Sequence, residues 1–370
     1  MTAKTFPFPE TSRDARIGVV LLGTGAVGSA LLRQLGPASR AGVALVGVAS
    51  SSVQYASSDG LGTASLRERL AAHGSPRDDA ALCAALYGFD CARQVVIDAT
   101  ASTDVASRHA QWLRQGYDVV TANKTAVGGT LQAWRDVQAA TWAGGSTYGD
   151  SATVGAGLPV LSTLRRLHGC GDRLLSLEGV FSGSLSWLFN HYDGTRPFSA
   201  LLAEARAWGY TEPDPRIDLS GADVARKLLI LARSAGHNLD AHEVEIENLV
   251  PTALRDVDAD AFRARAHELD APLAEKFAAA KSRGKVLRFL ARLDARGRAS
   301  VGVCEIEAAH PAARMTGCDN LFALTTSRYH AQPLVIQGAG AGPEVTAQAL
   351  LADVLALRER GVPRRLALAV

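Results

Sequence analysis

Several features are missing from this sequence, and each absence excludes a class of protein. No apolar run reaches the roughly 18 residues that a membrane-spanning helix needs, so we expect no membrane partner. The five cysteines are scattered and include no CxxC pair, and the nine histidines form no HxxxH or mixed Cys/His cluster. These patterns favour a cytoplasmic protein with free thiols and argue against a transition-metal site. Lys and Arg total 39 against 37 Asp and Glu, with no basic block, which argues against a nucleic-acid partner.

What is present indicates a globular protein of two domains. The chain has 370 residues, of which 47% are hydrophobic and 21% charged. In the first half, apolar strands at 16–22, 43–49, 94–98 and 117–121 alternate with helical patterns at 26–35, 66–73, 79–86 and 104–115. This alternation predicts a parallel sheet with both faces covered. We expect a flexible tail at 1–15 and a dinucleotide-binding domain at 16–150.

After residue 150 the pattern changes to an α+β domain. A long helical pattern at 222–234 is mixed with strands at 174–181, 286–293 and 300–306, which predicts a second domain at 151–335. A glycine-rich stretch precedes a last helix that begins at about Pro343. We expect this C-terminal segment, 336–370, to return to the nucleotide domain.

A glycine loop joins the first strand to the first helix. Its residues are Gly23, Gly25, Ala26, Val27 and Gly28, and the GxGxxG spacing in a strand–loop–helix context is typical of dinucleotide binding. Glycines that serve only tight packing are the alternative. The second strand ends in serines at 50–52, with no acid to bind an NAD ribose and no arginine beside them. NADP is therefore favoured, although NAD is possible.

The next two strands end in polar segments that should border the nicotinamide. Thr100 and Ala101 follow one strand, and Lys124 follows the other. Lys124 could equally be a solvated surface cation. The chain otherwise prefers arginine, which suggests that a lysine at this position is needed for its titratable amine.

The stretch GYTEPDPRIDLSGADVARK, residues 209–227, combines acids, prolines and a helix start. One interpretation is structural: Ser220 caps the helix, Asp223 completes a capping box, and Asp223 pairs with Lys227. That interpretation leaves Glu212 and Asp218 unexplained, although two prolines hold their loop rigid. The other interpretation is a site that binds a charged ligand.

Six motifs, in this order, resemble those of the homoserine dehydrogenases: GTGAVGSALL, VTANK, SATVGAGLPVLSTL, GVFSGSLSWLFN, GYTEPDPRIDLSGADVARK and GAGAGPEVTA. The resemblance implies an NAD(P)-dependent oxidoreductase that interconverts L-aspartate 4-semialdehyde and L-homoserine. It implies an N-terminal Rossmann-type domain and an α+β catalytic and dimerisation domain in a homodimer. We expect a short monofunctional form, without a kinase or a C-terminal regulatory domain. A related reductase of another amino-acid semialdehyde or imine, or an inactive nucleotide-binding sensor, remains an alternative.

The resemblance also implies roles for individual residues. Lys227, Lys124 and Asp223 are the expected catalytic residues, and either lysine could donate the proton. In the family, the residue matching Glu212 binds the substrate ammonium. We expect Asp218 to be a further substrate-site residue and to support Lys227. The remaining expected residues are Ser182, Gly183 and Ser184 at the substrate and Gly342 at the coenzyme.

One position departs from the family pattern. The family has a glutamate that helps to bind a monovalent cation, and this chain has Ser151 there. The backbone carbonyls of Val154, Ala156 and Leu158 match the other ligands. We therefore leave the cation undecided and expect sodium dependence to be weak.

Overall fold

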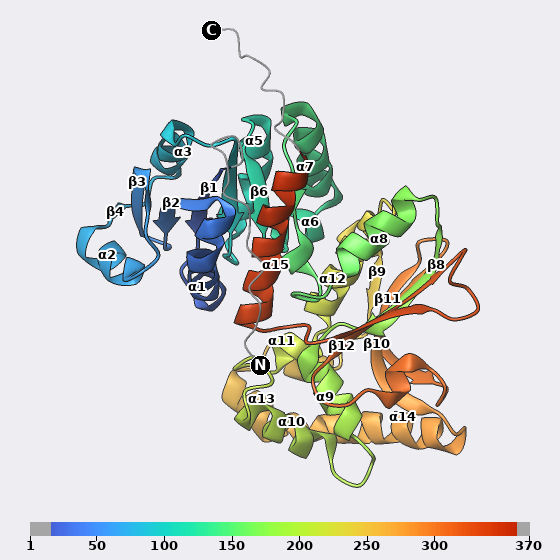
Figure 1. Cartoon of the computed structure of the whole chain (residues 1–370). Helices are drawn as coiled ribbons and strands as arrows, with labels where there is room; N and C mark the ends of the chain where they lie inside the picture. The colour runs from blue at the N-terminus through green and yellow to red at the C-terminus, as the bar shows by residue number, and fades with distance from the viewer. Residues whose placement is uncertain (1–15, 361–370) are drawn as a thin grey trace, which may run out of the picture. The chain divides into compact units, whose positions relative to one another are not determined.

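The computed structural model describes residues 16–360 and divides into two compact units (Figure 1). Unit 1 comprises the chain up to Gly157 together with the part from Gly342 onward, and unit 2 comprises Leu158–Ala341. The domain limits expected from the sequence, 150 and 335, lie several residues earlier than these divisions. The expected tail at 1–15 and the last ten residues of the expected C-terminal segment lie outside the described residues.

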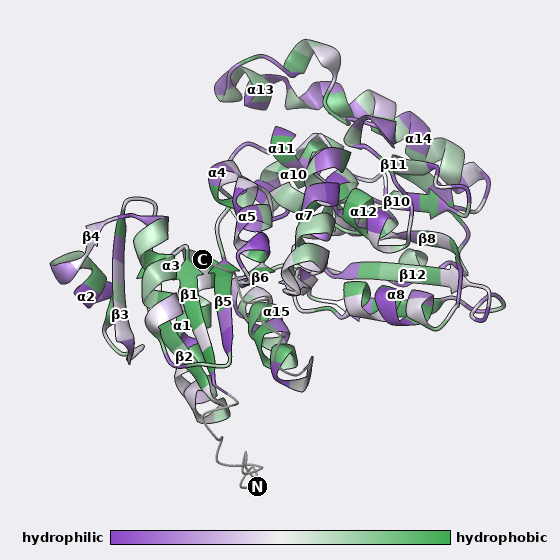
Figure 2. Cartoon of the chain, turned by 90° about the horizontal axis from the view of Figure 1, so that it is seen from above, coloured by the Kyte–Doolittle hydropathy of each residue, from purple (hydrophilic) through white to green (hydrophobic). Residues whose placement is uncertain are grey.

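Unit 1 is built on a seven-stranded sheet with the order β4-β3-β2-β1-β5-β6-β7. The strands from β2 to β7 in this order run parallel, whereas β3 and β4 are added antiparallel at one edge. Every residue of β1 and β5 is buried, and β1 is hydrophobic in Figure 2, whereas β5 combines hydrophobic and hydrophilic residues. Burial on both faces explains the continuous apolar sequence of β1. The strands are β1 (Ile17–Leu22), β2 (Val43–Ala49), β3 (Val53–Leu61), β4 (Ser75–Pro76), β5 (Arg93–Asp98), β6 (Asp118–Thr121) and β7 (Tyr148–Gly149).

One expected helix of unit 1 is divided into two. The predicted helix at 104–115 is interrupted at Arg108, whose N–H bonds to the carbonyl of Val105, the tighter spacing of a 3₁₀ turn. The break follows a helix start that the side chain of Ser102 caps. The helices of this unit are α1 (Ala26–Ala38), α2 (Leu66–His73), α3 (Asp79–Gly88), α4 (Thr103–Ser107), α5 (His109–Arg114), α6 (Thr125–Gly128), α7 (Leu131–Gly144) and α15 (Pro343–Ala356).

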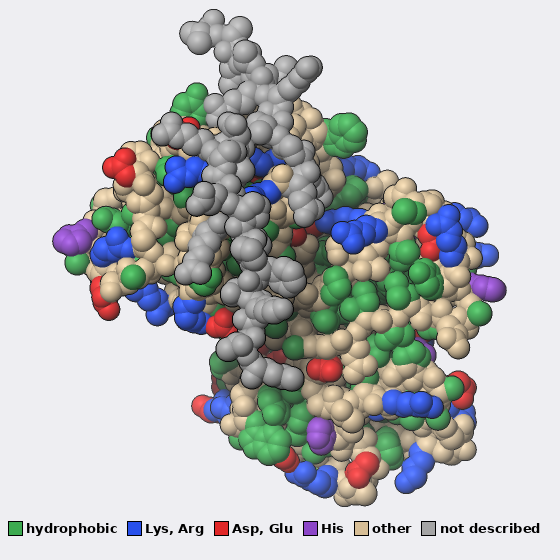
Figure 3. All heavy atoms as spheres, viewed as in Figure 1, with side chains coloured by type: hydrophobic (Ala, Val, Ile, Leu, Met, Phe, Trp, Pro, Cys, Tyr) green, Lys and Arg blue, Asp and Glu red, His purple; other side chains and the backbone are tan. Residues whose placement is uncertain are grey.

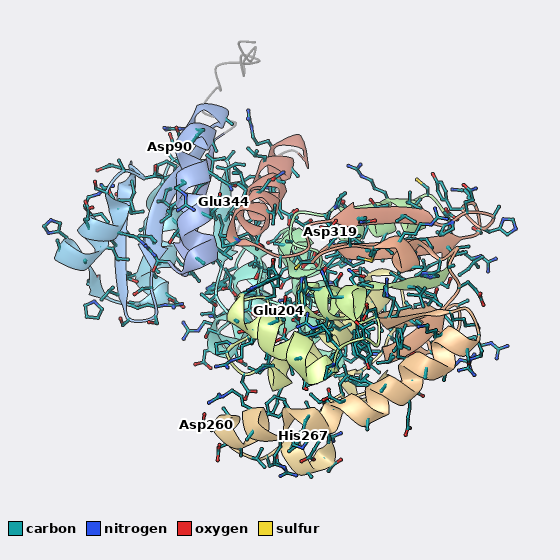
Figure 4. The ribbon with its side chains drawn as sticks, turned by 90° about the horizontal axis from the view of Figure 1, so that it is seen from below. Asp90, Glu204, Asp260, His267, Asp319 and Glu344 are labelled. Atoms are coloured by element: carbon teal, nitrogen blue, oxygen red, sulfur yellow. The ribbon has the colours of Figure 1, made fainter. Side chains whose placement is uncertain are left out.

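The last helix, α15, packs beside α1, the first helix of the same unit (Figure 1). At its first turn, Glu344 faces α1 (Figure 4), where it accepts a hydrogen bond from Gln34 at 3.1 Å and pairs with Arg33. Ala347, Leu350 and other apolar residues of α15 join the core beneath β1 and β5. The C-terminal segment thus completes the hydrophobic core of unit 1.

Unit 2 contains a six-stranded sheet with the order β13-β12-β8-β10-β11-β9, antiparallel except for the β11–β9 pair. Phe181 stacks on Phe322 at 4.6 Å between ring centroids in its core. Its strands are β8 (Leu174–Val180), β9 (Val244–Ile246), β10 (Val286–Asp294), β11 (Ala299–Ile306), β12 (Asn320–Thr326) and β13 (Leu334–Gly338). Its helices are α8 (Val160–Gly169), α9 (Gly183–His191), α10 (Phe198–Ala207), α11 (Arg216–Leu219), α12 (Ala222–Ser234), α13 (Ala259–Arg265) and α14 (Asp270–Ser282).

Short 3₁₀ segments complete the fold, at Ser39–Ala41, Ser151–Thr153, Ala241–Glu243, Thr252–Leu254, Ala266–Leu269, Pro311–Arg314 and Leu357–Arg360. On the face shown in Figure 3, basic and acidic side chains are interspersed over both units. Within residues 16–360, none of the helices combines the length and the apolar character that a membrane crossing requires.

Candidate active site

The glycine loop after β1 has the geometry that dinucleotide binding requires. Gly23 has a φ of +100°, and a Cβ on Gly28 would lie only 1.9 Å from the Gly23 carbonyl oxygen. These two glycines are therefore needed for the turn and for close packing of α1. A Cβ on Gly25, by contrast, would meet nothing within 4 Å. Gly25 faces open space, which leaves room for a pyrophosphate against the amides at the start of α1.

A cavity of about 740 Å³ lies at this end of the unit 1 sheet. Among the expected residues, Gly23, Gly25, Thr100 and Ala101 line it. Three others, Ala26, Val27 and Gly28, form the first turn of α1. Lys124 precedes α6 and Gly342 precedes α15, and neither is among the residues that line this cavity.

Asp98 belongs to the segment that we expected to border the nicotinamide, but the sequence did not predict its contacts. Its side chain is fully buried at the end of β5. It accepts hydrogen bonds from the N–H and hydroxyl of Thr100 at 2.8 and 2.7 Å, and from Asn123 at 3.0 Å. His109 Nε2 lies 3.0 Å from the same carboxylate, and Tyr148 lies 3.0 Å from His109 Nδ1. One buried carboxylate thus connects the loops that follow β5 and β6. Lys124 belongs to the second of these loops, directly before α6.

The expectation that no arginine stands beside the serines after β2 is wrong. The antiparallel pairing of β4 with β3 brings Arg77 back to this point, where its guanidinium donates to the Ser50 carbonyl at 3.1 Å. Ser50, Ser51 and Arg77 line the unit 1 cavity together. Arg77 follows Ser50 by 27 positions, so only the strand pairing reveals their proximity.

Unit 2 has its own cavity, of about 570 Å³, at the start of α12. Ser182, Glu212, Asp218 and Asp223 line it, so the structure brings together four of the expected residues. Ser182 begins α9, whereas the other three lie in the stretch 209–227. The lining of the cavity therefore combines carboxylates, hydroxyl groups and guanidinium groups.

Lys227 is buried beside this cavity rather than among the residues that line it. Its Nζ donates to the Phe181 carbonyl at 2.7 Å and lies 2.8 Å from Asp223, one helical turn earlier. Only 11% of the Lys227 side chain is exposed, whereas 48% of Asp223 is. The pair is therefore not the exposed surface ion pair of the structural interpretation, because burial strengthens its electrostatic interaction.

Asp218 joins two segments beside the unit 2 cavity. Its carboxylate accepts from the Ser184 hydroxyl at 2.7 Å and from the N–H of Glu212 at 2.8 Å. The Ser182 and Ser184 hydroxyls are 2.9 Å apart. Asp218 thus connects the Glu212 loop to the start of α9. Gly183 lies between the two serines, and a Cβ there would lie 3.1 Å from the Cys318 carbonyl.

The expected capping box at α12 is also wrong. The residue that precedes the helix is Gly221, with a φ of +71°, and no side chain caps it. The Ser220 hydroxyl donates to the Ile217 carbonyl at the end of α11 and accepts from Ala222 N–H at 3.2 Å. The Ser220 side chain therefore bonds to the short helix α11, which the sequence pattern did not predict.

A guanidinium clamp holds the acidic loop in place. Arg216 bonds to both oxygens of Asp214, and it also donates to the Leu254 and Arg255 carbonyls at 3.3 and 3.2 Å. The hydrogen bonds from Arg216 lower the pKa of Asp214 below its ordinary value. Asp214 is therefore ionised at neutral pH and stabilises the loop in that form.

Two protein-family models match the chain. The family model of the homoserine dehydrogenase matches residues 159–355, and the model of the homoserine dehydrogenase NAD-binding domain matches residues 23–148. The chain belongs to the homoserine dehydrogenase family.

Individual relatives agree with this membership. A bifunctional aspartokinase/homoserine dehydrogenase 2 from Zea mays is 40% identical over 92% of this chain, and this match covers 38% of the relative. The chain thus spans well under half the length of that enzyme. A homoserine dehydrogenase from Emericella nidulans is 40% identical over 72% of this chain and 76% of its own length. A crystal structure of a Candida auris protein of unknown function has a TM-score of 0.87 at 33% identity, covering 93% and 99% of the two chains.

The position where homoserine dehydrogenases have the cation-binding glutamate is occupied differently here. The N–H and hydroxyl of Ser151 donate to the two oxygens of Asp353 on α15, at 2.9 and 2.7 Å. Asp353 is a carboxylate that sequence analysis did not connect with this position. Ser151 brings no charge of its own, and the nearby carboxylate already accepts its hydrogen bonds. In the part of the chain that is described, no group of three His, Cys, Asp or Glu side chains could hold a metal ion. Position 151 thus supplies no negatively charged ligand for a cation.

Proposed function

We propose that this chain catalyses the NAD(P)-dependent interconversion of L-aspartate 4-semialdehyde and L-homoserine. The observation that carries the proposal is the buried lysine at a cavity lined by carboxylates and hydroxyl groups. Homoserine offers an ammonium, a carboxylate and a hydroxyl, and this cavity has groups suited to the first and the last. Unit 1 supplies the coenzyme-binding glycine loop, and unit 2 supplies the substrate-binding residues.

The proposed roles follow from the contacts of each residue. Glu212, whose loop is tied down by Asp218, binds the substrate ammonium. The Ser182 and Ser184 hydroxyls border the substrate at the start of α9. The nicotinamide supplies or accepts a hydride at its C4 position. A positive charge beside the reacting oxygen then stabilises the developing alkoxide.

Lys227 is positioned for that last task. An ammonium has three N–H donors. In Lys227, one is directed to the Phe181 carbonyl and one to Asp223. One donor is left for the substrate oxygen. General acid catalysis by such a group contributes roughly 10²–10⁴ in rate. Lys124, at the end of β6, is the other candidate proton donor.

The direct test is turnover of the purified protein with homoserine and each coenzyme. We expect NAD(P)H formation with L-homoserine, and much slower turnover with serine, threonine and other hydroxy amino acids. Turnover of another amino-acid semialdehyde or imine in preference to homoserine would identify a related reductase. Coenzyme binding without any turnover across this panel would identify a nucleotide-binding sensor.

We further propose that the chain forms a homodimer and works in the cytoplasm. Homodimers are implied by the family resemblance, and five unpaired cysteines suit a reducing compartment. Light scattering should give a mass twice that of one chain. A monomer that turns over homoserine normally would contradict the dimer.

A further inference from the structure

The outer part of the unit 1 cavity contains a charged cluster to which the family motifs assign no role. Besides the glycine loop and the serines after β2, the cavity is lined by Arg77, Asp79 and Arg108. These three residues, the Arg–Asp–Arg cluster, come from the turn after β4, the start of α3 and the break between α4 and α5. Two segments, 77–79 and the break at Arg108, thus converge at the carboxyl end of β2.

The contacts within the cluster are specific. Arg77 Nε donates to Asp79 Oδ1 at 2.7 Å, and a terminal nitrogen of Arg77 lies 3.2 Å from Oδ2. Arg108 donates to the same Oδ2 at 2.7 Å. Only 8% of the Asp79 side chain and 16% of the Arg77 side chain are exposed, whereas 49% of Arg108 is. Asp79 therefore holds a buried and a half-exposed guanidinium together.

The backbone fixes Arg77 from a second direction. Its guanidinium donates to the Ser50 carbonyl at 3.1 Å, and its own N–H donates to the Ser52 carbonyl at 2.9 Å. Gln54 accepts from the N–H of Asp78 at 2.8 Å and anchors the same turn. The guanidinium is thus pre-organised at the end of β2, where dinucleotide-binding folds place the adenosine ribose.

The cluster has the wrong chemistry for NAD and the right chemistry for NADP. An enzyme that selects NAD uses a carboxylate at this place to accept hydrogen bonds from the ribose hydroxyls. Both oxygens of Asp79 already accept from guanidinium groups. Two cations against one anion leave the cluster positive, and each guanidinium has five N–H donors, more than its contacts here use. A phosphate fits these remaining donors.

One further carboxylate lines the cavity. Asp104 lies in the first turn of α4, one turn before Arg108, and it is exposed. Its charge is screened by solvent and salt, whereas the Arg77–Asp79 pair is mostly shielded from both. Asp104 weakens the positive potential without occupying the guanidinium groups.

We propose that the Arg–Asp–Arg cluster binds the 2′-phosphate of NADP(H), with Arg77 and Arg108 as its ligands and Asp79 as the residue that positions them. The inference rests on the coenzyme binding of the proposed function and adds the residues that select the coenzyme. Neither arginine belongs to the glycine loop or to the residues directly after β2.

The test uses two probes that differ only in the phosphate concerned, adenosine 2′,5′-bisphosphate and adenosine 5′-monophosphate. Their dissociation constants are measured by calorimetry on the purified full chain, with no need for turnover. We expect the bisphosphate to bind at least about tenfold more tightly to the unaltered protein, as a charge-assisted hydrogen bond provides. Equal affinity, or tighter binding of the monophosphate, would overturn the proposal.

Variants locate the effect. Arg77→Ala should weaken the bisphosphate by roughly 10- to 100-fold and leave the monophosphate unchanged. Arg108→Ala should act in the same direction but less, because Arg108 is half exposed. Asp79→Asn should also reduce the ratio of the two affinities, since it releases both arginines. An unchanged ratio in Arg77→Ala would overturn the proposal.

Two controls separate this effect from general charge and from catalysis. Arg135→Ala removes an exposed arginine of α7 outside the cavity and should change neither probe. Asp104→Asn should tighten the bisphosphate slightly, as removal of a screened repulsion predicts. If homoserine turnover is absent while the two probes are still distinguished, the proposed function fails and the coenzyme assignment holds. If homoserine is turned over equally with both coenzymes and Arg77→Ala has no effect, only the assignment fails.

Discussion

The cavities of the two units are assembled in opposite ways. In unit 1, the polar groups come from the ends of β2, β4 and β5 and from the break before α5. Asp98, for example, contacts a residue 25 positions away in the sequence. In unit 2, most of the groups come from one continuous stretch, 209–227. The first arrangement depends on strand pairing, whereas the second is mostly local. The rigid crevice suits a large, constant coenzyme, and the loop-and-helix pocket suits a small substrate.

Removal of Asp98 should have the largest effect on stability. Asp98→Ala leaves His109, Asn123 and Thr100 without their shared acceptor in a fully buried position. We expect a loss of about 3–5 kcal/mol in the free energy of unfolding, because several polar groups lose their acceptor at about 1–3 kcal/mol each. Urea denaturation measures it. Because Asp98 contacts several segments of unit 1, the substitution should loosen all of them together.

A matched control is Asp90→Ala, because Asp90 is an exposed aspartate of the same unit (Figure 4). It should change stability by less than about 0.5 kcal/mol. Asp98→Asn should lie between the two, because the amide keeps the shape but loses the charge. A near-normal midpoint for Asp98→Ala would show that the network does not hold the crevice together.

Substitution of Lys227 tests unit 2 in the same way. Lys227→Met should lower kcat by roughly 10²-fold or more, through loss of the charge and proton at the reacting oxygen. Lys227→Arg keeps the charge and can still pair with Asp223, but a guanidinium does not readily release a proton. It should therefore also be severely impaired. Coenzyme affinity should stay unchanged, since the glycine loop belongs to unit 1.

Lys276→Met is the control for Lys227, because Lys276 forms a half-exposed pair with Glu247 at 2.7 Å in the same unit. Its turnover should be normal. The measurements are kcat, coenzyme Kd and melting temperature. Normal turnover in Lys227→Arg would transfer the role of proton donor to Lys124.

The same contrast explains how much the sequence could predict. The Rossmann-type unit, the α+β unit and the glycine loop were predicted correctly, because apolar periodicity and glycine spacing are local signals. The strand β3, next to the edge strand β4, was missed because its sequence, VQYASSDGL, is polar and half exposed. The place of Arg77 and the contacts of Asp98 were missed for another reason. Their partners are distant in the sequence, and only the pairing and register of the strands bring them together.

The capping of α12 shows a local signal that failed. Ser220 and Asp223 have the spacing of a capping box, but Gly221 adopts a left-handed conformation and begins the helix instead. Packing favours glycine there, because a Cβ would lie 3.1 Å from Phe289 and 3.2 Å from Ile246. Tertiary contacts thus override a local motif.

The effect of sodium on turnover should be small, and smaller than the effects of the substitutions described above. Ser151 supplies no negative charge, and the carboxylate of Asp353 accepts two hydrogen bonds from it. Turnover in sodium chloride and in the chloride of a bulky organic cation should therefore be similar. Ser151→Glu should strengthen sodium binding. A several-fold activation of the unaltered protein by sodium would show that the backbone carbonyls suffice.

The smallest expected effect concerns the clamp on the acidic loop. Asp214→Asn removes the charge that Arg216 holds, and because Asp214 is 31% exposed we expect a loss of only about 0.2–1 kcal/mol near neutral pH. The sign of the pH dependence follows from the lowered pKa of Asp214. An aspartate whose folded pKa is depressed contributes stability above its unfolded pKa of about 3.9, and that contribution disappears as the pH falls through the folded value.

The difference in unfolding free energy between the unaltered protein and Asp214→Asn should therefore be constant from about pH 7 to pH 5 and should shrink on further acidification. Urea denaturation across this range measures it. Asp260→Asn, which alters an exposed pair with Arg263 one helical turn away (Figure 4), should show almost no difference at any pH. The KM for homoserine adds a second reading, because a loosened loop should raise it while kcat changes little. A stability difference that grows on acidification would contradict the assigned contact, and an unchanged KM would show that the clamp does not position Glu212.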